Sequence, residues 1–383
     1  MDSRSRVESA LKHREPDRVP FDLGGTETSG IHRIALKNWL SFNGFPESEP
    51  RICSLATQSG AVEEEVVHRF GIDVRCLRVR QPAAASVQVR KEGDSSVFQD
   101  EWGIRWRMPL DGGLYYDICS HPLAGFSTVQ EIERYRWPDT AEPSRYAGLK
   151  QDARALTTSG RPALVLERHT GGIFETSWWQ RGLENLLVDM ASDSRLAEAL
   201  LHKMLEHKLL YWEKALEQVG DQILVAAEAD DLATQSGLLM SKGMYRKYLK
   251  PLHRQLFAFI KGKAPAVKLF YHSCGAVAEL IPDLLEAGVD ILNPIQVSAA
   301  GMDTRKLKRE YGKDLVFWGG GVDTQRVLPY GTPEQVHDEV KRRIEDLAPG
   351  GGFVFSAVHC IQSDVPPQNI QAMWEALREY GAY

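Results

Sequence analysis

A histidine and a cysteine separated by one residue are the side chains of this sequence best suited to chemistry. His272 and Cys274 directly follow the apolar run 267–271, which is typical of a strand. In an extended segment, side chains two residues apart point the same way, so both face one target. Imidazole nitrogen and thiolate sulfur are zinc ligands, and the pair therefore predicts a metal site. The alternative is that Cys274 is buried and His272 only hydrogen-bonds a substrate.

A third metal ligand is expected from another strand end, because catalytic zinc usually keeps three protein ligands and one open position. His359 and Cys360 follow a second apolar run, 353–356. Either side chain has a suitable donor atom. At this point the choice between them stays open.

Three carboxylates within four residues form the second candidate site. Glu228, Asp230 and Asp231 follow the apolar run 223–227. Neighbouring carboxylates repel one another, which raises the pKa of one of them toward the range of acid–base catalysis. We therefore predict that these three residues are catalytic. The alternative is a solvated turn in which Asp231 caps a helix.

The run Trp178-Trp179-Gln180-Arg181 is the third candidate. Aromatic side chains beside one arginine could form the wall of a cofactor site. The alternative is a packed core with a structural ion pair.

Short apolar runs alternate with segments of helical spacing from about residue 160 onward. One such helix is expected to begin at Thr332 and Pro333, an N-cap followed by proline at the first helical position. This alternation predicts a parallel sheet covered by helices. The runs, together with an earlier one, are 19–23, 163–166, 223–227, 267–271, 291–294, 315–318 and 353–356.

Chemically capable residues lie at the C-terminal end of nearly every one of these runs. A closed barrel gathers all its strand ends around one mouth, whereas an open sheet does not. The sequence therefore predicts an α/β fold, a (β/α)8 TIM barrel, as one domain over residues 1–383. Residues 85–120 predict an inserted β-meander, with turns at 92–94 and 111–113. The strand-end residues are Asp22, Glu167, Glu228, His272, Asn293, Gln296 and His359, of which Glu167, Asn293 and Gln296 are predicted to bind substrate.

Composition excludes several classes of function. The 383 residues include 46 Lys and Arg against 52 Asp and Glu, with no basic run, so nucleic acid is not an expected partner. No apolar run reaches the roughly 20 residues that span a bilayer, and the polar N-terminus is unlike a secretory signal. Five widely spaced cysteines argue against a disulfide framework. We expect a cytoplasmic protein without a membrane partner, and a homodimer is compatible with these features.

Several segments together resemble the uroporphyrinogen-decarboxylase-like superfamily, across essentially the whole chain. That superfamily contains cofactor-independent decarboxylases and zinc-dependent methyltransferases that use a corrinoid protein. The resemblance implies a TIM barrel. The segments are His13-Arg14-Glu15-Pro16-Asp17-Arg18-Val19-Pro20, Trp179-x-Arg181-Gly182-x-Glu184-Asn185, Asp230-Asp231-Leu232-x-Thr234-Gln235, Gly350-Gly351-Gly352-Phe353 and Asp364-Val365-Pro366-Pro367-Gln368-Asn369-Ile370.

The resemblance is to the methyltransferase branch. True decarboxylases carry an N-terminal arginine-rich segment that grips the substrate carboxylates, and residues 21–27 here contain no arginine. The methyltransferases carry H-x-C and a later cysteine as zinc ligands. Counting back from Pro366 and Pro367 places His359, not Cys360, at the later position. The resemblance thus implies zinc held by His272, Cys274 and His359.

The function implied is methyl transfer between a small O-methyl or N-methyl compound and a corrinoid (cobalamin) carried by a partner protein. Two alternatives stay open. One is a metal-independent carboxy-lyase of the uroporphyrinogen decarboxylase type. The other is a non-catalytic protein that binds a corrinoid or tetrapyrrole.

Overall fold

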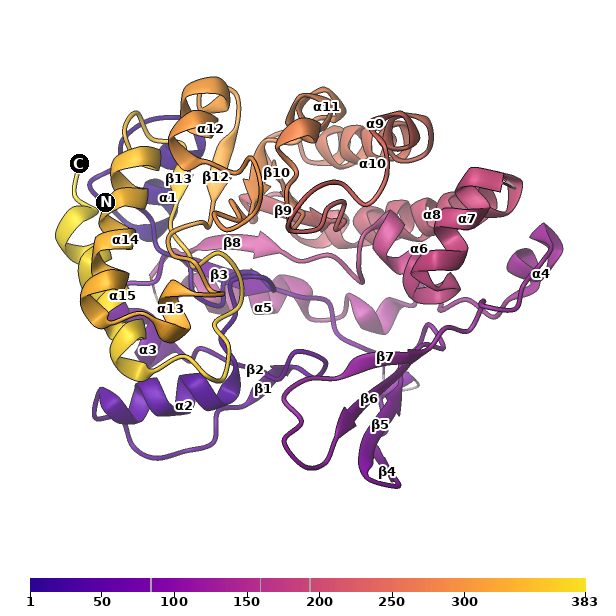
Figure 1. Cartoon of the computed structure of the whole chain (residues 1–383), viewed down its shortest axis with the longest axis horizontal. Helices are drawn as coiled ribbons and strands as arrows, with labels where there is room; N and C mark the ends of the chain where they lie inside the picture. Colours follow the sequence, from indigo (N-terminus) through magenta and orange to yellow (C-terminus); the bar gives the residue numbers. More distant parts are fainter. Residues whose placement is uncertain (83–84, 159, 193) are drawn as a thin grey trace.

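Seven parallel strands form the centre of the molecule in the computed structural model, which describes residues 1–82, 85–158, 160–192 and 194–383 (Figure 1). Their order in the sheet is β13-β12-β11-β10-β9-β8-β3. Each strand pairs in parallel with its neighbours. The strands are β3 (Val74–Leu77), β8 (Ala163–Leu166), β9 (Val225–Ala229), β10 (Lys268–His272), β11 (Ile291–Asn293), β12 (Val316–Trp318) and β13 (Phe353–Val354).

The segment around Phe21 closes this sheet into a barrel. Asp73 N–H donates to the carbonyl oxygen of Phe21 at 2.8 Å on the β3 side. Asp22 N–H donates to Phe355 O at 2.8 Å on the β13 side, next to a parallel bridge between Phe21 and Phe355. The predicted strand 19–23 thus stands in the eighth position, although it is reduced to isolated bridges. The fold is the predicted (β/α)8 TIM barrel.

The apolar runs predicted most of these strands but not all of their ends. The run 163–166 coincides with β8. The run 223–227 is displaced, because β9 continues to Ala229 and so contains Glu228. Strand β3 was not predicted, since its sequence Val-Arg-Cys-Leu interrupts the apolar run with an arginine. This omission has consequences for the site, because cavity residues follow β3.

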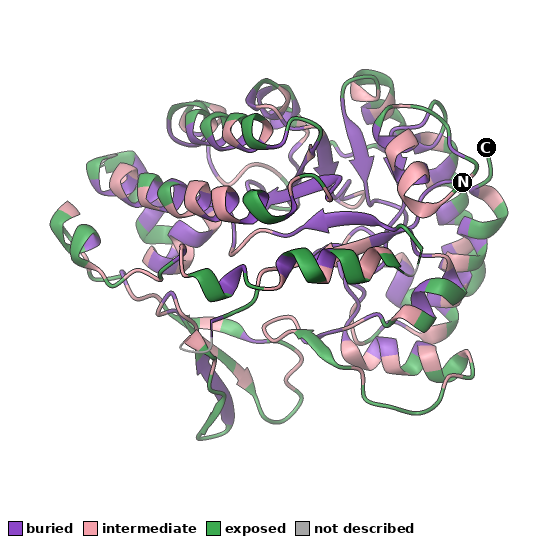
Figure 2. Cartoon of the chain, turned by 180° about the vertical axis from the view of Figure 1, so that it is seen from behind, coloured by how far each residue is buried: buried purple, intermediate pink, exposed green. Residues whose placement is uncertain are grey.

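Two apolar layers hold the barrel together. Side chains inside the barrel form one buried cluster, which includes Val165, Ala227, Phe270 and Trp318. Helix α1 (Ser3–Leu11) adds Val7, Ala10 and Leu11 to that cluster and so covers one end of the barrel. The larger cluster lies between the strands and the surrounding helices. In Figure 2 the barrel strands are buried at the centre, and the helices around them are exposed only on their outer sides.

The helices that surround the barrel follow the predicted alternation. Helix α14 (Pro333–Leu347) begins as expected, with the Thr332 side chain accepting from Gln335 N–H. The other helices are α2 (Arg33–Phe42), α3 (Glu64–Phe70), α4 (Val129–Arg134), α5 (Leu149–Thr158), α6 (Ile173–Arg181), α7 (Leu183–Ser192), α8 (Ser194–Val219), α9 (Lys242–Met244), α10 (Lys250–Lys263), α11 (Ile281–Ala287), α12 (Thr304–Tyr311), α13 (Val327–Tyr330) and α15 (Pro367–Tyr380).

The predicted meander is a four-stranded antiparallel sheet that stands beside the barrel (Figure 1). It consists of β4 (Arg90–Glu92), β5 (Ser95–Gln99), β6 (Arg105–Pro109) and β7 (Asp117–Ser120). The predicted turn at 92–94 joins β4 to β5, with Gly93 at a φ of +61°. Gln180 Nε2 of α6 donates to Trp102 O at 3.1 Å and ties the meander to the barrel. A separate pair of short strands, β1 (Ile52–Ser54) and β2 (Ser59–Gly60), lies near α2.

Two further predictions relate to the chain as a whole. The division into a single domain over residues 1–383 stays a prediction. None of the helices in the described part of the chain has both the length and the apolar composition needed to cross a bilayer.

Candidate metal centre

The end of β10 and the loop after β13 place the predicted metal ligands beside one another. His272 ends β10 and pairs in register with Ala229 of β9 and with Asn293 of β11. Phe270, two residues earlier, faces the barrel interior, so His272 faces the barrel mouth. Gly275, at a φ of +91°, then turns the chain away; a Cβ there would lie 2.6 Å from the carbonyl oxygen of Thr234.

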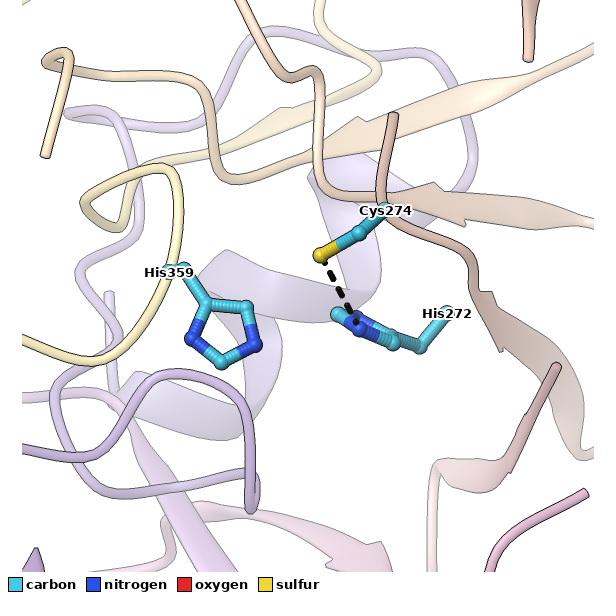
Figure 3. A group of neighbouring side chains, drawn as sticks. All are labelled: His272, Cys274 and His359. Atoms are coloured by element: carbon cyan, nitrogen blue, oxygen red, sulfur yellow. Dashed lines mark hydrogen bonds between the residues drawn. The ribbon is translucent and has the colours of Figure 1, made fainter. Parts of the chain in front are cut away.

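His272, Cys274 and His359 point toward one another at this mouth (Figure 3). One potential ligand atom from each residue lies within 4.8 Å of the other two. Cys274 Sγ is 3.5 Å from His272 Nε2. The rings of His272 and His359 have centroids 5.4 Å apart at an angle of 64°. The loop after β13 thus brings His359 to the residue that ends β10 and to Cys274, which follows that strand.

Asn293 sets the tautomer of His272. Its Oδ1 accepts from His272 Nδ1 at 2.6 Å, and its Nδ2 donates to the carbonyl oxygen of Trp318 at 2.9 Å. Because a carbonyl oxygen only accepts, the orientation of the Asn293 amide is determined, and His272 carries its proton on Nδ1. The lone pair of His272 Nε2 therefore faces Cys274. Thr28 Oγ1 donates to the same Asn293 oxygen at 3.0 Å.

Burial keeps both imidazoles neutral. It lowers the pKa of His272 to about 4 and also lowers the pKa of His359. Burial and the charge of Asp231 raise the pKa of the Cys274 thiol well above its usual value. Two neutral nitrogens are thus available at pH 7 without deprotonation, whereas the thiol has to release a proton to bind a metal.

Cys360, the other candidate for the third position, has a different environment. It is buried, and its Sγ donates to the carbonyl oxygen of Glu27 at 3.3 Å. Its sulfur does not belong to the group of converging ligand atoms. The geometry thus favours His359 as the third ligand over Cys360.

The three predicted catalytic carboxylates occupy different environments. Glu228 is buried against the helix layer, where Lys208 Nζ donates at 2.9 Å and Trp212 Nε1 at 2.5 Å. Asp230 is fully buried and accepts from Glu175 N–H and His253 Nε2, both at 2.7 Å. Strand β9 therefore directs both side chains away from the mouth.

Asp231 alone of these carboxylates lies beside the metal ligands. Its Oδ1 accepts from Cys274 N–H at 2.8 Å and is 3.7 Å from His272 Nε2. Its side chain is 38% exposed, so a carboxylate oxygen is accessible from the cavity. Asp231 does not cap a helix, which was the alternative interpretation.

The three residues predicted to bind substrate also differ in position: one lines the cavity, and two lie behind the predicted metal ligands. Glu167 lines the cavity, and its Oε1 accepts from Glu27 N–H at 2.6 Å. Gln296 Oε1 accepts from Gly275 N–H at 2.6 Å and so holds the loop that carries Cys274. Asn293 contacts His272 as described. Gln296 and Asn293 thus hold the loop of Cys274 and the ring of His272, respectively, from behind.

A cavity of about 580 Å3 opens next to the His272–Cys274–His359 cluster. Trp106 and Tyr116 of the meander region form part of its wall, opposite residues that follow the barrel strands. Trp179 also lines it, whereas Arg181 pairs with Asp189 at 2.8 Å. The aromatic run therefore provides one cavity residue and one structural ion pair.

Sequence reasoning missed several charged residues of this cavity. Arg78 follows the unpredicted strand β3, and Arg168 follows Glu167. Arg145 hydrogen-bonds Glu101, which extends from the meander, and His169. Burial and the charge of Asp231 raise the pKa of Glu175 to about 8, so this cavity carboxyl is mostly protonated at pH 7. Arg168 could have been identified from its position just after the predicted strand 163–166. No feature of the sequence indicated the other charged residues of the cavity.

Comparison with proteins of known sequence places these observations in a family. The model of the family described as "Uroporphyrinogen decarboxylase (URO-D)" matches residues 129–380, more than half of the chain. A uroporphyrinogen decarboxylase of Pseudoalteromonas atlantica is 25% identical over 285 residues, which cover 70% of this chain and 74% of that protein. A methylated-thiol–coenzyme M methyltransferase of Methanosarcina mazei is 25% identical over 201 residues.

Two of the matches cover only about half of the related protein. A uroporphyrinogen decarboxylase of Chlorobium limicola is 27% identical over 198 residues, and the chain spans about half the length of that protein and of the Methanosarcina enzyme.

Among solved structures, a methyltransferase from Methanosarcina mazei has the same fold. It superposes with a TM-score of 0.63 at 19% identity, over 99% of each chain. The residues matched by the family model include most of the barrel, with His272, Cys274 and His359. The chain belongs to the uroporphyrinogen decarboxylase (URO-D) family.

Proposed function

We propose that this protein is a zinc-dependent methyltransferase that moves a methyl group between a small O-methyl or N-methyl compound and a corrinoid protein. One observation carries the proposal. Ligand atoms of His272, Cys274 and His359 converge within 4.8 Å beside a cavity of about 580 Å3. A cavity of this size is large enough for a small molecule.

The donor set fits zinc in both chemistry and spacing. Two imidazole nitrogens and one thiolate are ligands typical of catalytic zinc, which leaves one position open. Bonds of about 2.0 Å to nitrogen and 2.3 Å to sulfur separate two tetrahedral ligands by about 3.5 Å. His272 Nε2 and Cys274 Sγ are 3.5 Å apart. Little rearrangement is therefore needed for these two atoms to share one ion.

Zinc bound here would supply a Lewis acid for the heteroatom that carries the methyl group. The surrounding residues prepare this step. Asn293 holds the His272 ring, and Gln296 holds the loop of Cys274. Asp231 has a carboxylate oxygen accessible from the cavity, where it can take the proton that a hydroxyl or amine loses on being methylated, or return a proton to the oxygen or nitrogen from which the methyl group leaves. Glu228 and Asp230, also predicted to be catalytic, act in this proposal by positioning α8 and α6.

The partners are inferred from family resemblance. The methyltransferase branch implies a corrinoid carried by a separate protein, which would approach the open barrel mouth. A Methanosarcina methyltransferase of the same fold supports the reaction class. Glu167, at the cavity wall, is proposed to contact the methylated compound.

Methyl transfer to free cob(I)alamin tests the reaction. The purified protein is supplied with zinc, cob(I)alamin and a panel of small O-methyl and N-methyl compounds. We expect the absorbance change that accompanies methylcobalamin formation with at least one donor, and its loss in His272→Ala. Donor-dependent methylcobalamin formation that persists in His272→Ala would contradict the role of the metal centre.

The alternative activity is decarboxylation of uroporphyrinogen, which is favoured by the names of several relatives and by arginines in the cavity. Arg80, Arg145 and Arg168 are already paired with protein carboxylates. An octa-anionic substrate would leave most of its carboxylates unpaired on burial in the cavity, at a cost of several kcal/mol each. We therefore expect no enzymatic release of carbon dioxide from uroporphyrinogen, measured with carboxyl-labelled substrate.

A further inference from the structure

Arg78 differs from the other arginines that line the cavity. It follows β3, and it shares the cavity with Arg80, Arg145 and Arg168. Arg80 pairs with Asp152 at 2.9 Å, and Arg145 pairs with Glu101. Arg168 lies 3.3 Å from Glu167 and 3.6 Å from Glu27. Within the described residues Arg78 forms no ion pair.

The hydrogen bonds of Arg78 hold its guanidinium through uncharged acceptors, and the carboxylates of Glu27 and Glu167 act on its charge only from beyond ion-pair distance. Nε donates to Cys76 Sγ at 3.1 Å, and Nη1 donates to the carbonyl oxygen of Cys53 at 3.0 Å. Burial raises the pKa of the Cys76 thiol to about 12, so this acceptor is uncharged at pH 7. Nη2 makes no hydrogen bond to any described residue. The side chain thus has a fixed position, a full positive charge and a free donor.

Other cavity residues indicate what kind of ligand the space around Arg78 favours. Trp106 and Trp179 line the same cavity, with ring centroids 5.8 Å apart at 80°. These indole rings favour an apolar body. His272 and His359 line the cavity as well, so a ligand that contacts Arg78 shares one space with the metal centre.

We propose that Arg78 anchors one carboxylate of the methyl-bearing substrate, which makes that substrate a monoanion with an apolar body. The assignment rests on the proposed function in naming the methyl-bearing compound as the ligand. A single unpaired guanidinium provides for one anionic group, and arginine binds carboxylates through directed, charge-assisted hydrogen bonds. Arg168 does not fill this role, because Glu27 and Glu167 lie within ion-pair distance of it, whereas they affect Arg78 only from a longer range.

Binding of matched ligand pairs tests the assignment without methyl transfer. The probes are 3-methoxybenzoate with 3-methoxybenzamide, and methoxyacetate with 2-methoxyacetamide. Calorimetry on the full-length protein gives the affinity of each probe. We expect the carboxylate of at least one pair to bind about tenfold or more tightly than its amide, as loss of a charged hydrogen bond implies. Arg78→Met should remove that preference, and Arg78→Lys should keep part of it.

Arg80→Met is the matched control, because Arg80 lines the same cavity but is paired with Asp152. It should retain the preference for the carboxylate. Zinc content and circular dichroism of Arg78→Met should match those of the unmodified protein, which separates loss of the anchor from loss of the metal centre or of the fold. The assignment is wrong if no carboxylate binds better than its amide, or if the preference survives in Arg78→Met.

Discussion

The side-chain oxygen of Asn293 lies 2.6 Å from His272 Nδ1, and the Asn293 amide is itself oriented by the carbonyl of Trp318. This arrangement directs the free lone pair of His272 toward Cys274 before any metal binds. Partners of this kind typically contribute tenfold to a hundredfold to metal affinity. Among the residues that lie behind the proposed ligands, Asn293 is therefore the one whose loss should weaken zinc binding most.

We predict that Asn293→Ala weakens zinc binding by about tenfold to a hundredfold. Competition with a chromophoric chelator measures the change. Asn369→Ala is the control, because Asn369 is also a buried asparagine but donates to Leu328 O and Gly331 O. It should leave zinc affinity unchanged. Equal zinc affinities in the two variants would rule out the role of Asn293.

The third ligand can be identified by comparing adjacent residues. We predict that His359→Ala loses zinc and that Cys360→Ala retains it, because Cys360 Sγ donates to Glu27 O instead of facing the cluster. Metal analysis after gel filtration measures the zinc content of each variant. Loss of zinc in Cys360→Ala with retention in His359→Ala would reverse the assignment.

Glu228 should matter for stability, because removing it leaves Lys208 buried and unpaired. Both side chains are only 2% exposed. We predict that Glu228→Ala lowers the free energy of unfolding by about 3–5 kcal/mol. Glu206→Ala, which removes an exposed partner of Lys203 on the same helix, should cost less than about 1 kcal/mol. Urea unfolding compares the two, and similar losses would show that burial of the Glu228 pair has no special effect.

The titration of Asp22 should make the free energy of unfolding depend on pH. Burial raises the pKa of Asp22 to about 7, from 3.8 in the unfolded chain. The folded state therefore holds this proton more tightly, and the associated stabilisation is lost as pH rises from about 4 to about 7. Asp22→Asn cannot titrate. The difference in unfolding free energy between the natural protein and Asp22→Asn should change across this window and stay constant above it; a difference independent of pH would contradict this prediction.

Much of the barrel was predictable because its strands are buried on both faces and so appear as continuous apolar runs. The run 163–166 is β8, and the run 267–271 predicted β10, which extends by one residue to include His272, so that only Cys274 follows the strand. Strand β3 escaped detection because Arg75 interrupts its apolar run. Arg78, which follows β3, could not be assigned to the mouth without that strand.

The carboxylates predicted to be catalytic show a different limit of prediction from sequence. Position in the chain places Glu228 near the mouth, but the direction of its side chain depends on the strand's two-residue period. Ala227 faces the barrel interior, so Glu228 faces the helices, where Lys208 of α8 meets it. No local pattern reveals that partner, because it comes from a different element. Sequence alone therefore predicts which strand ends gather, but not which side chains enter the cavity.

The metal content of the purified protein tests the central claim most directly. Protein prepared without chelators and supplied with zinc should contain about one zinc per chain by mass spectrometry of the metal. His272→Ala, folded by circular dichroism, should contain almost none. A folded natural protein that holds less than about a tenth of a zinc per chain under these conditions would contradict the account, because a catalytic zinc site of this donor set is expected to fill.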